Sequence, residues 1–168
     1  MSPSSGARGT LDTYSMREVS PSNIPRDTAR AMSQDNVETV RAAAAAFNRR
    51  DLDVWLEYFA DEIDYRAIEG APDDPGPMHG KDAIRAYAQD WLGTFDKFRS
   101  EPVELIKAGE DTVIAVTRIS GHARLSGVET NLTYAALYTF RNGKIVRGRE
   151  FWTPAEALEA ARLPDSQR

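Results

Sequence analysis

Four side chains of this sequence could carry acid/base chemistry: Glu150, Arg118, Tyr65 and His122. Glu150 lies in an apolar stretch, where a carboxylate is costly unless it is paired or in use. Burial raises the pKa of a carboxyl group, which would make Glu150 a candidate general base. Arg118, Tyr65 or His122 could then stabilise the negative charge that develops on a substrate oxygen. These residues predict proton transfer in an apolar pocket.

A structural interpretation competes at each of these positions. Glu150 could form an ion pair with Arg118 or lie near an exposed sheet edge. His122 titrates near neutral pH, but a lone histidine close to a hairpin turn is more often a surface residue. Tyr65 could belong to the core.

The stretch 129–152 must position Glu150, because it is typical of two β-strands joined by a two-residue turn. Asn142-Gly143 supplies the two positive-φ residues that a type I′ turn needs. If the residues on either side of this turn pair, Ala135 lies opposite Glu150.

A second predicted turn, Ser126-Gly127, joins a strand over 112–125 to this hairpin. Its register brings polar residues of both strands onto the face of Glu150, unless a bulge intervenes. We expect that face to line the pocket, covered by an amphipathic helix over 81–96. Besides the four residues above, the predicted pocket residues are Trp91, Tyr87, Ser120, Asn131, Thr133, Ala135, Leu137 and Trp152. Trp91, like Tyr65, could equally be plain core.

The opposite face of the same hairpin carries Tyr134, Tyr138, Phe140 and Phe151. A monomer would expose these aromatic residues in a larger patch than soluble monomers usually tolerate. We therefore expect a homodimer that pairs through this face.

The remaining elements follow from periodicity and capping signals. Helices are predicted from 35 to 47, with Asp35 and Glu38 as a capping box, from 52 to 59 after Asp51, and from 154 to 161 after Thr153. Strands are predicted over 63–68 and 98–107. The loop 69–80 is rich in Pro and Gly, and its length is typical of a functional lid.

Composition limits the function classes. The chain has 168 residues, 41% of them hydrophobic, and a net charge of -5 from 21 basic and 26 acidic residues. The absence of cysteine excludes disulfides and thiolate chemistry and is compatible with the cytoplasm. No basic stripe indicates nucleic acid, and no apolar run is long enough to span a membrane. The acids Glu69, Asp73 and Asp74 with His79 fit no recognised metal spacing, so we expect neither a metal nor a cofactor.

Residues 1–31 differ from the rest. They are rich in Ser, Pro and Arg and lack apolar periodicity. We expect a disordered N-terminal extension here, of either artefactual or regulatory origin, followed by a single domain over 32–168.

The order of elements predicts an α+β fold. Three motifs are notable: Phe47-Asn48-Arg49-Arg50-Asp51-Leu52-Asp53, Gly80-Lys81-Asp82-Ala83 and Asn142-Gly143-Lys144-Ile145-Val146. With them, residues 33–163 resemble the SnoaL-like branch of the nuclear transport factor 2-like superfamily. The resemblance implies a cone-shaped barrel: a curved antiparallel or mixed sheet wrapped on three main helices, with a short C-terminal helix. It also implies sheet-to-sheet dimers, and functions that range from cyclases, isomerases, epoxide hydrolases and dehydratases to non-enzymatic binding.

The segment 147–152 is locally similar to the last strand of limonene-epoxide hydrolase. The resemblance implies that Glu150 holds an attacking water and that Arg118 is the arginine of its catalytic set. Ser120 stands where that family has its general acid, and Ala67 where it has an asparagine. In SnoaL-type cyclases the catalytic acid falls nearest Thr153, which the sequence predicts as a helix cap.

These observations lead to three hypotheses. The first is a cofactor-independent acid/base enzyme acting on a hydrophobic or cyclic small molecule, as a cyclase, isomerase, hydrolase or dehydratase would. The second is a non-catalytic pocket for a hydrophobic ligand, and the third is a dimerisation module.

Overall fold

The computed structural model describes residues 26–168. Within this range the elements are α1 (Arg26–Asn48), α2 (Leu52–Glu57), β1 (Phe59–Arg66), β2 (Pro77–His79), α3 (Lys81–Thr94), β3 (Phe95–Lys107), β4 (Thr112–Ala123), β5 (Glu129–Arg141), β6 (Lys144–Phe151), α4 (Pro154–Ala161) and the 3₁₀ helix η2 (Asp165–Gln167).

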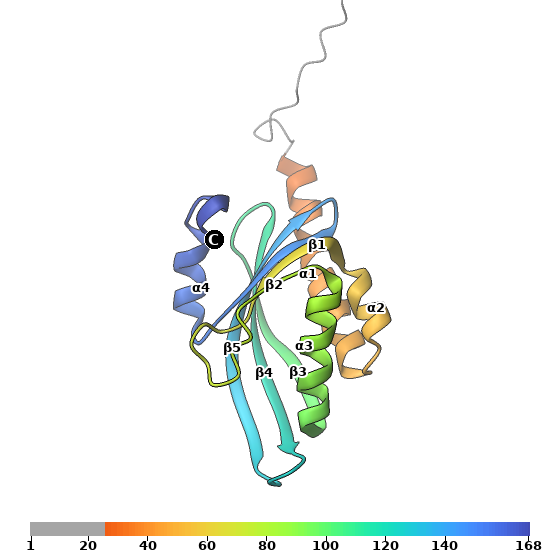
Figure 1. Ribbon diagram of the computed structural model, residues 1–168. Helices are drawn as coiled ribbons and strands as arrows, with labels where there is room; N and C mark the ends of the chain where they lie inside the picture. Colours follow the sequence, from red (N-terminus) through yellow and green to blue (C-terminus); the bar gives the residue numbers. More distant parts are fainter. Residues whose placement is uncertain (1–25) are drawn as a thin grey trace, which may run out of the picture.

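The strands form one mixed sheet in the order β2-β1-β6-β5-β4-β3. β1 is parallel to β6, whereas all other neighbours are antiparallel. The sheet curves around α1 and α3 (Figure 1). In the described part of the chain its edge strands β2 and β3 do not pair, so the cone stays open. The predicted α+β class with a curved mixed sheet is confirmed.

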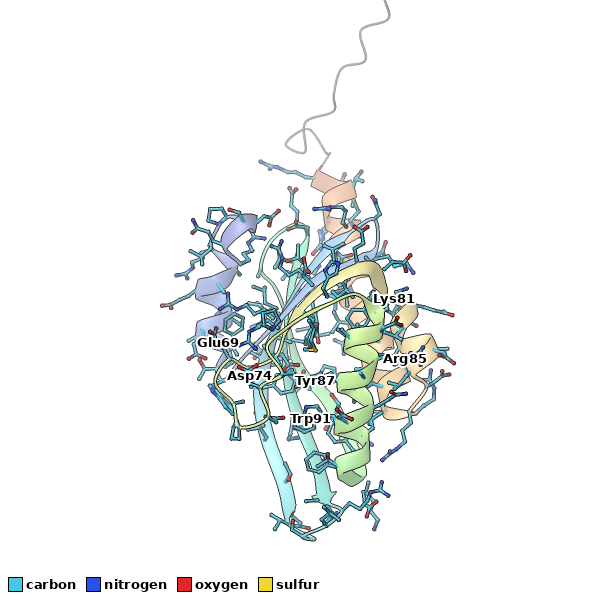
Figure 2. The ribbon with its side chains drawn as sticks, viewed as in Figure 1. Glu69, Asp74, Lys81, Arg85, Tyr87 and Trp91 are labelled. Atoms are coloured by element: carbon cyan, nitrogen blue, oxygen red, sulfur yellow. The ribbon has the colours of Figure 1, made fainter. Side chains whose placement is uncertain are left out.

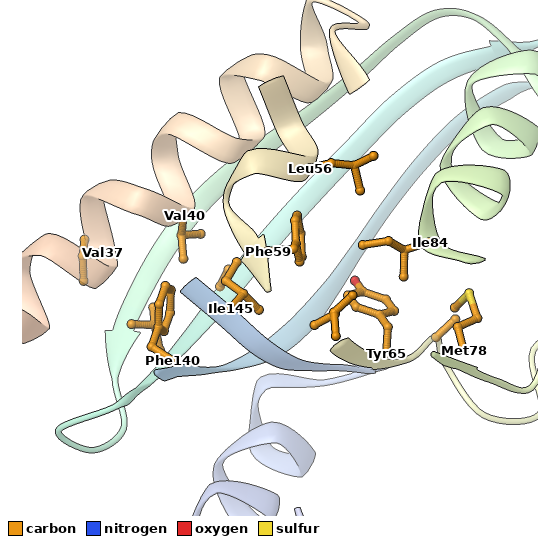
Figure 3. Close-up of a cluster of buried hydrophobic side chains, with 13 residues drawn as sticks. Val37, Val40, Leu56, Phe59, Tyr65, Met78, Ile84, Phe140 and Ile145 are labelled. Carbon is orange, nitrogen blue, oxygen red and sulfur yellow. The ribbon is translucent and has the colours of Figure 1, made fainter. Parts of the chain in front are cut away.

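The two faces of the sheet are covered by different helices. α1, α2 and α3 pack on the inner face around a buried cluster that includes Val40, Phe59, Ile84 and Ile145 (Figure 3). α4 covers part of the outer face, where its alanines pack on Leu137 and its neighbours. The inner face holds the space in which a ligand could bind.

Helix α1 begins earlier than the sequence predicted. It starts at Arg26, so residues 26–31 are helical rather than part of the expected extension, and Asp35 lies inside the helix instead of capping it. The side chains described in this first part of the helix are exposed, and a solvated helical turn leaves no apolar period in the sequence. The rest of the predicted extension, 1–25, lies outside the described residues.

One of the two predicted turns is correct. Asn142 and Gly143 have φ values of 51° and 75°, as a type I′ turn requires. The other turn is longer than Ser126-Gly127, and His122 pairs with Glu129 rather than with Asn131. Because this shift is by two residues, it does not change which side chains of β4 and β5 share a face.

A bulge between β5 and β6 overturns the prediction for Glu150. It shifts the pairing by one residue, so Glu150 lies opposite Ala136 rather than Ala135. Side chains alternate along a strand, and one extra residue therefore moves Glu150 from the face of Leu137 to the face of Tyr138.

The predicted dimer face was wrong as well. Tyr138 and Phe140 pack on the inner face beneath the chain's own helices, and Tyr134 lies beside them, whereas Phe151 lies on the outer face against α4. The homodimer itself stays a prediction. Separately, none of the helices within residues 26–168 is both long and apolar enough to cross a membrane.

Thr153 and Glu156 close the start of α4 with a capping box, as predicted. We expect Thr153→Ala to lower the free energy of unfolding in urea by about 1 kcal/mol, because the amide of Glu156 loses its acceptor. Thr153→Ser retains the hydroxyl and should match the parent protein. Equal stability of the two variants would contradict this role.

Candidate active site

A cavity of about 130 Å³ lies between the inner face of the sheet and helices α1 and α3. Aromatic side chains dominate its wall: Phe47, Trp55, Phe59, Tyr65, Tyr87, Trp91, Phe98, Tyr134 and Tyr138. Glu150 is the one charged side chain among the described residues that line it. A mostly apolar wall with a single carboxyl group is typical of a small-molecule site.

Glu150 is held by Tyr65. The Tyr65 hydroxyl donates a hydrogen bond of 2.7 Å to Glu150 Oε1. The two side chains meet because β1 and β6 are parallel neighbours that pair Tyr65 with Gly148, two residues before Glu150 on the same face. Glu150 retains some accessible surface, since its carboxyl group lines the cavity.

Burial raises the pKa of Glu150 from 4.5 to about 7. The hydrogen bond from Tyr65 opposes this rise, as does the backbone N–H of Ile68, whereas the negative charge of Asp73 adds to it. Near neutral pH both protonation states of Glu150 are therefore populated, as a group that accepts and returns a proton requires.

Four tyrosines surround this carboxyl group. Burial raises the pKa of Tyr65, Tyr87, Tyr134 and Tyr138, and the nearby charge of Glu150 raises each further. The four hydroxyls consequently stay protonated and can donate hydrogen bonds.

The loop between β1 and β2 is fixed by Asp74. Both terminal nitrogens of Arg66 donate to its carboxylate, and the backbone amides of Gly70 and Gly76 donate at 2.9 Å each. The Arg66 guanidinium and these amides hold the pKa of Asp74 well below its usual range. In Figure 2, Tyr87 and Trp91 project from α3 toward the sheet, and the charges of Asp73 and Asp74 in this loop act on Tyr87.

Asp74 thus holds the loop together through these hydrogen bonds. Among residues 26–168, no three His, Asp or Glu side chains converge in the way that a metal ion would need.

Two of the four predicted acid/base residues come together and two do not. Glu150 and Tyr65 share the cavity, together with the predicted pocket residues Tyr87 and Trp91. Arg118 lies on the outer face, paired with Glu101 at 2.8 Å.

His122 also belongs to the outer face, where it contacts Glu129 at 3.1 Å. The bulge separated both residues from Glu150, so neither contributes to this site. Since Ser120 is on the same outer face, the catalytic set implied by the epoxide hydrolase does not assemble.

The other predicted pocket residues lie outside the cavity for the same reason. Ala135 and Leu137 pack against α4 on the outer face, and Trp152 follows the end of β6 with 47% of its surface exposed. Ser120, Asn131 and Thr133 lie on the same outer face, where Ser120 pairs with Asn131 and Arg118 pairs with Thr133.

Sequence reasoning missed Tyr134, Tyr138 and Thr117 as cavity residues. The alternation of aromatic residues in β5 was visible, but it was assigned to a dimer surface. Gly148, inside a strand, was a further signal in the sequence, because a glycine within a strand often marks the close approach of another group, here the Tyr65 ring.

A model of the SnoaL-like domain matches residues 40–148. The chain belongs to the SnoaL-like family. The resemblance inferred from the sequence is confirmed, and the cavity described above is therefore that of a SnoaL-like domain.

Three known proteins are similar to this SnoaL-like chain. YesE of Bacillus subtilis (strain 168) is 28% identical over 128 residues, which are 73% of this chain and 84% of YesE. Bal32a, from a soil-derived mobile gene cassette, has a TM-score of 0.65 at 26% identity and covers 75% of this chain and 95% of its own. A protein of Xanthomonas campestris pv. campestris, described as a candidate polyketide cyclase, has a TM-score of 0.61 at 20% identity, covering 77% and 98%. This last likeness shows the fold alone.

Gly148 allows Tyr65 to reach Glu150 in this SnoaL-like site. A Cβ atom at position 148 would lie 2.5 Å from Tyr65 Cδ2, far inside van der Waals contact. The ring of Tyr65 therefore lies directly on the backbone of β6.

We expect Gly148→Ala to displace the Tyr65 ring and to lower the free energy of unfolding in urea by about 1–3 kcal/mol, as overpacking does. Gly93→Ala is the matched control, because Gly93 lies in α3 with no neighbour within 4 Å of an added Cβ. That change should be neutral or stabilising. A Gly148→Ala variant as stable as Gly93→Ala would show that the ring has room to move.

Proposed function

We propose that this SnoaL-like domain is a cofactor-independent enzyme that moves a proton on an apolar, cyclic small molecule, with Glu150 as the acid/base group. The observation that carries the proposal is a carboxyl group in an apolar cavity, hydrogen-bonded to Tyr65 and with a pKa of about 7. A purely structural carboxylate would be expected to have a cationic partner, and no cation lines this cavity among the described residues.

In the proposed step, ionised Glu150 takes a proton from a carbon next to a carbonyl group. The electron pair of the broken C–H bond forms a C=C bond while the π pair of the C=O bond moves to the oxygen, which gives an enolate. Protonated Glu150 can return the proton to a carbon of this conjugated system, and the C=O bond forms again. Tyr87 on α3 and Tyr134 on β5 line the cavity and sense the charge of Glu150. Their hydroxyls can donate hydrogen bonds to the oxyanion, in place of the predicted Arg118 and His122.

The description of one structural neighbour is compatible with this class of reaction and names no substrate. The Xanthomonas neighbour is described as a candidate polyketide cyclase, and closing a ring next to a carbonyl group begins with this kind of proton transfer. The apolar wall favours a substrate that is itself mostly apolar.

A second candidate function is non-catalytic binding of a hydrophobic ligand. It is favoured by the location of Arg118 and His122 on the outer face, because Glu150 is then the one acid/base group with a pKa near 7 among the described residues that line the cavity.

Proton exchange on carbon separates the two candidates. In D₂O, the protein should accelerate deuterium incorporation next to the carbonyl group of small cyclic ketones, as followed by proton NMR. The rate should rise with pH through about 7, because the ionised form of Glu150 is the base. Glu150→Gln should retain the fold and slow the exchange by roughly a hundredfold or more.

Glu110→Gln is the control, since it removes the same charge from an exposed turn between β3 and β4. Equal exchange rates in the parent protein and in Glu150→Gln would exclude Glu150 as the base. Rings that bind without any accelerated exchange would favour the non-catalytic function.

A further inference from the structure

We propose that the cavity selects an uncharged, ring-bearing ligand with a hydroxyl or carbonyl group at its Glu150 end, and that it excludes carboxylates and phosphates of the same size. This inference rests on the proposed function because it concerns the same cavity, and it names the substrate class.

The cavity offers no positive charge to an anion. Its described lining contains no Lys, Arg or His. The two arginines that flank this end of the sheet, Arg66 and Arg149, have other partners. Arg66 binds the Asp74 carboxylate, and Arg149 lies over the ring of Phe151 on the outer face. An anionic ligand would therefore lose its hydration without gaining an ion pair, which is strongly unfavourable.

The groups that face Glu150 disfavour the binding of an anionic ligand further. From the loop, Asp73 contributes a second negative charge. From β1, α3 and β5 come the hydroxyls of Tyr65, Tyr87, Tyr134 and Tyr138, which are neutral. Above a pH of about 7 an anion in the cavity would face ionised Glu150 as well. Neutral oxygens, by contrast, find both donors and acceptors here.

A continuous wall of rings fits a cyclic ligand. The centroids of Phe59 and Trp55 are 4.8 Å apart, those of Trp55 and Phe47 5.3 Å, and those of Phe47 and Phe98 5.8 Å. Trp91 extends the series 6.1 Å beyond Phe98. All five rings line the cavity, so a ligand ring that packs against this wall gains edge and face contacts with them.

The size of the cavity indicates a small ring. An apolar cavity of ~150 Å³ admits benzene, and the cavity of this domain has about 130 Å³. A single ring with one polar substituent is thus a suitable probe.

Benzyl alcohol and benzoate test the inference because they share a ring and differ in charge. The dissociation constant of each compound is measured by NMR titration of the protein. The titration is done at a pH about one unit above the pKa of Glu150 and again about one unit below it. At the higher pH benzoate should bind at least roughly tenfold more weakly than benzyl alcohol. At the lower pH this difference should shrink, since Glu150 is then mostly protonated.

Two variants identify the source of the selectivity. Glu150→Gln should remove the dependence of the difference on pH, whereas Glu110→Gln, which changes the net charge equally, should retain it. Benzoate that binds as tightly as benzyl alcohol would overturn the inference and leave the proton-transfer proposal standing. If neither probe bound, the proposed ring-sized site would be refuted. Benzyl alcohol that bound as expected, without exchange on cyclic ketones, would instead refute the catalytic proposal alone.

Discussion

The burial of one carboxyl group is the constraint around which this site is built. A pKa raised from 4.5 to about 7 means that ionised Glu150 costs the folded state on the order of 3 kcal/mol. The unfolded chain releases this proton near pH 4.5 and the folded chain only near 7, so stability falls as pH rises between these values and levels off above them. Only the rest of the structure can offset this cost, and a group tuned in this way is a candidate for function.

Several local features keep Glu150 where it is. The bulge between β5 and β6 turns it to the inner face, and the bare backbone of Gly148 lets the Tyr65 ring reach it. Asp74 ties down the neighbouring loop, which brings the charge of Asp73 toward the carboxyl group. Each feature involves only one or two residues, and together they determine the electrostatic environment of the Glu150 carboxyl group.

The sequence predicted the fold far better than the site. Alternation, helical periodicity and the Asn142-Gly143 turn are local signals, and they were sufficient for the element order and the SnoaL-like family. The face of Glu150 depended on a single bulge, and one residue of register exchanges the two faces of a strand. Glu150 was identified because a carboxylate is costly on an apolar strand face, and Tyr65 was identified as a candidate pocket residue. Arg118 was predicted on the face of Glu150 but lies on the opposite face. The Arg66–Asp74 pair was missed because its geometry exists only once the loop has folded.

The protonation of Glu150 is the most direct test of this account. Carbon-13 NMR of the labelled carboxyl group, followed across a pH titration, reports the pKa of this one side chain. We expect a midpoint near 7, and a higher midpoint in Tyr65→Phe, because that variant lacks the hydrogen bond that favours the ionised form. A midpoint near 4.5 that does not respond to Tyr65→Phe would show an ordinary solvated acid and would contradict the account.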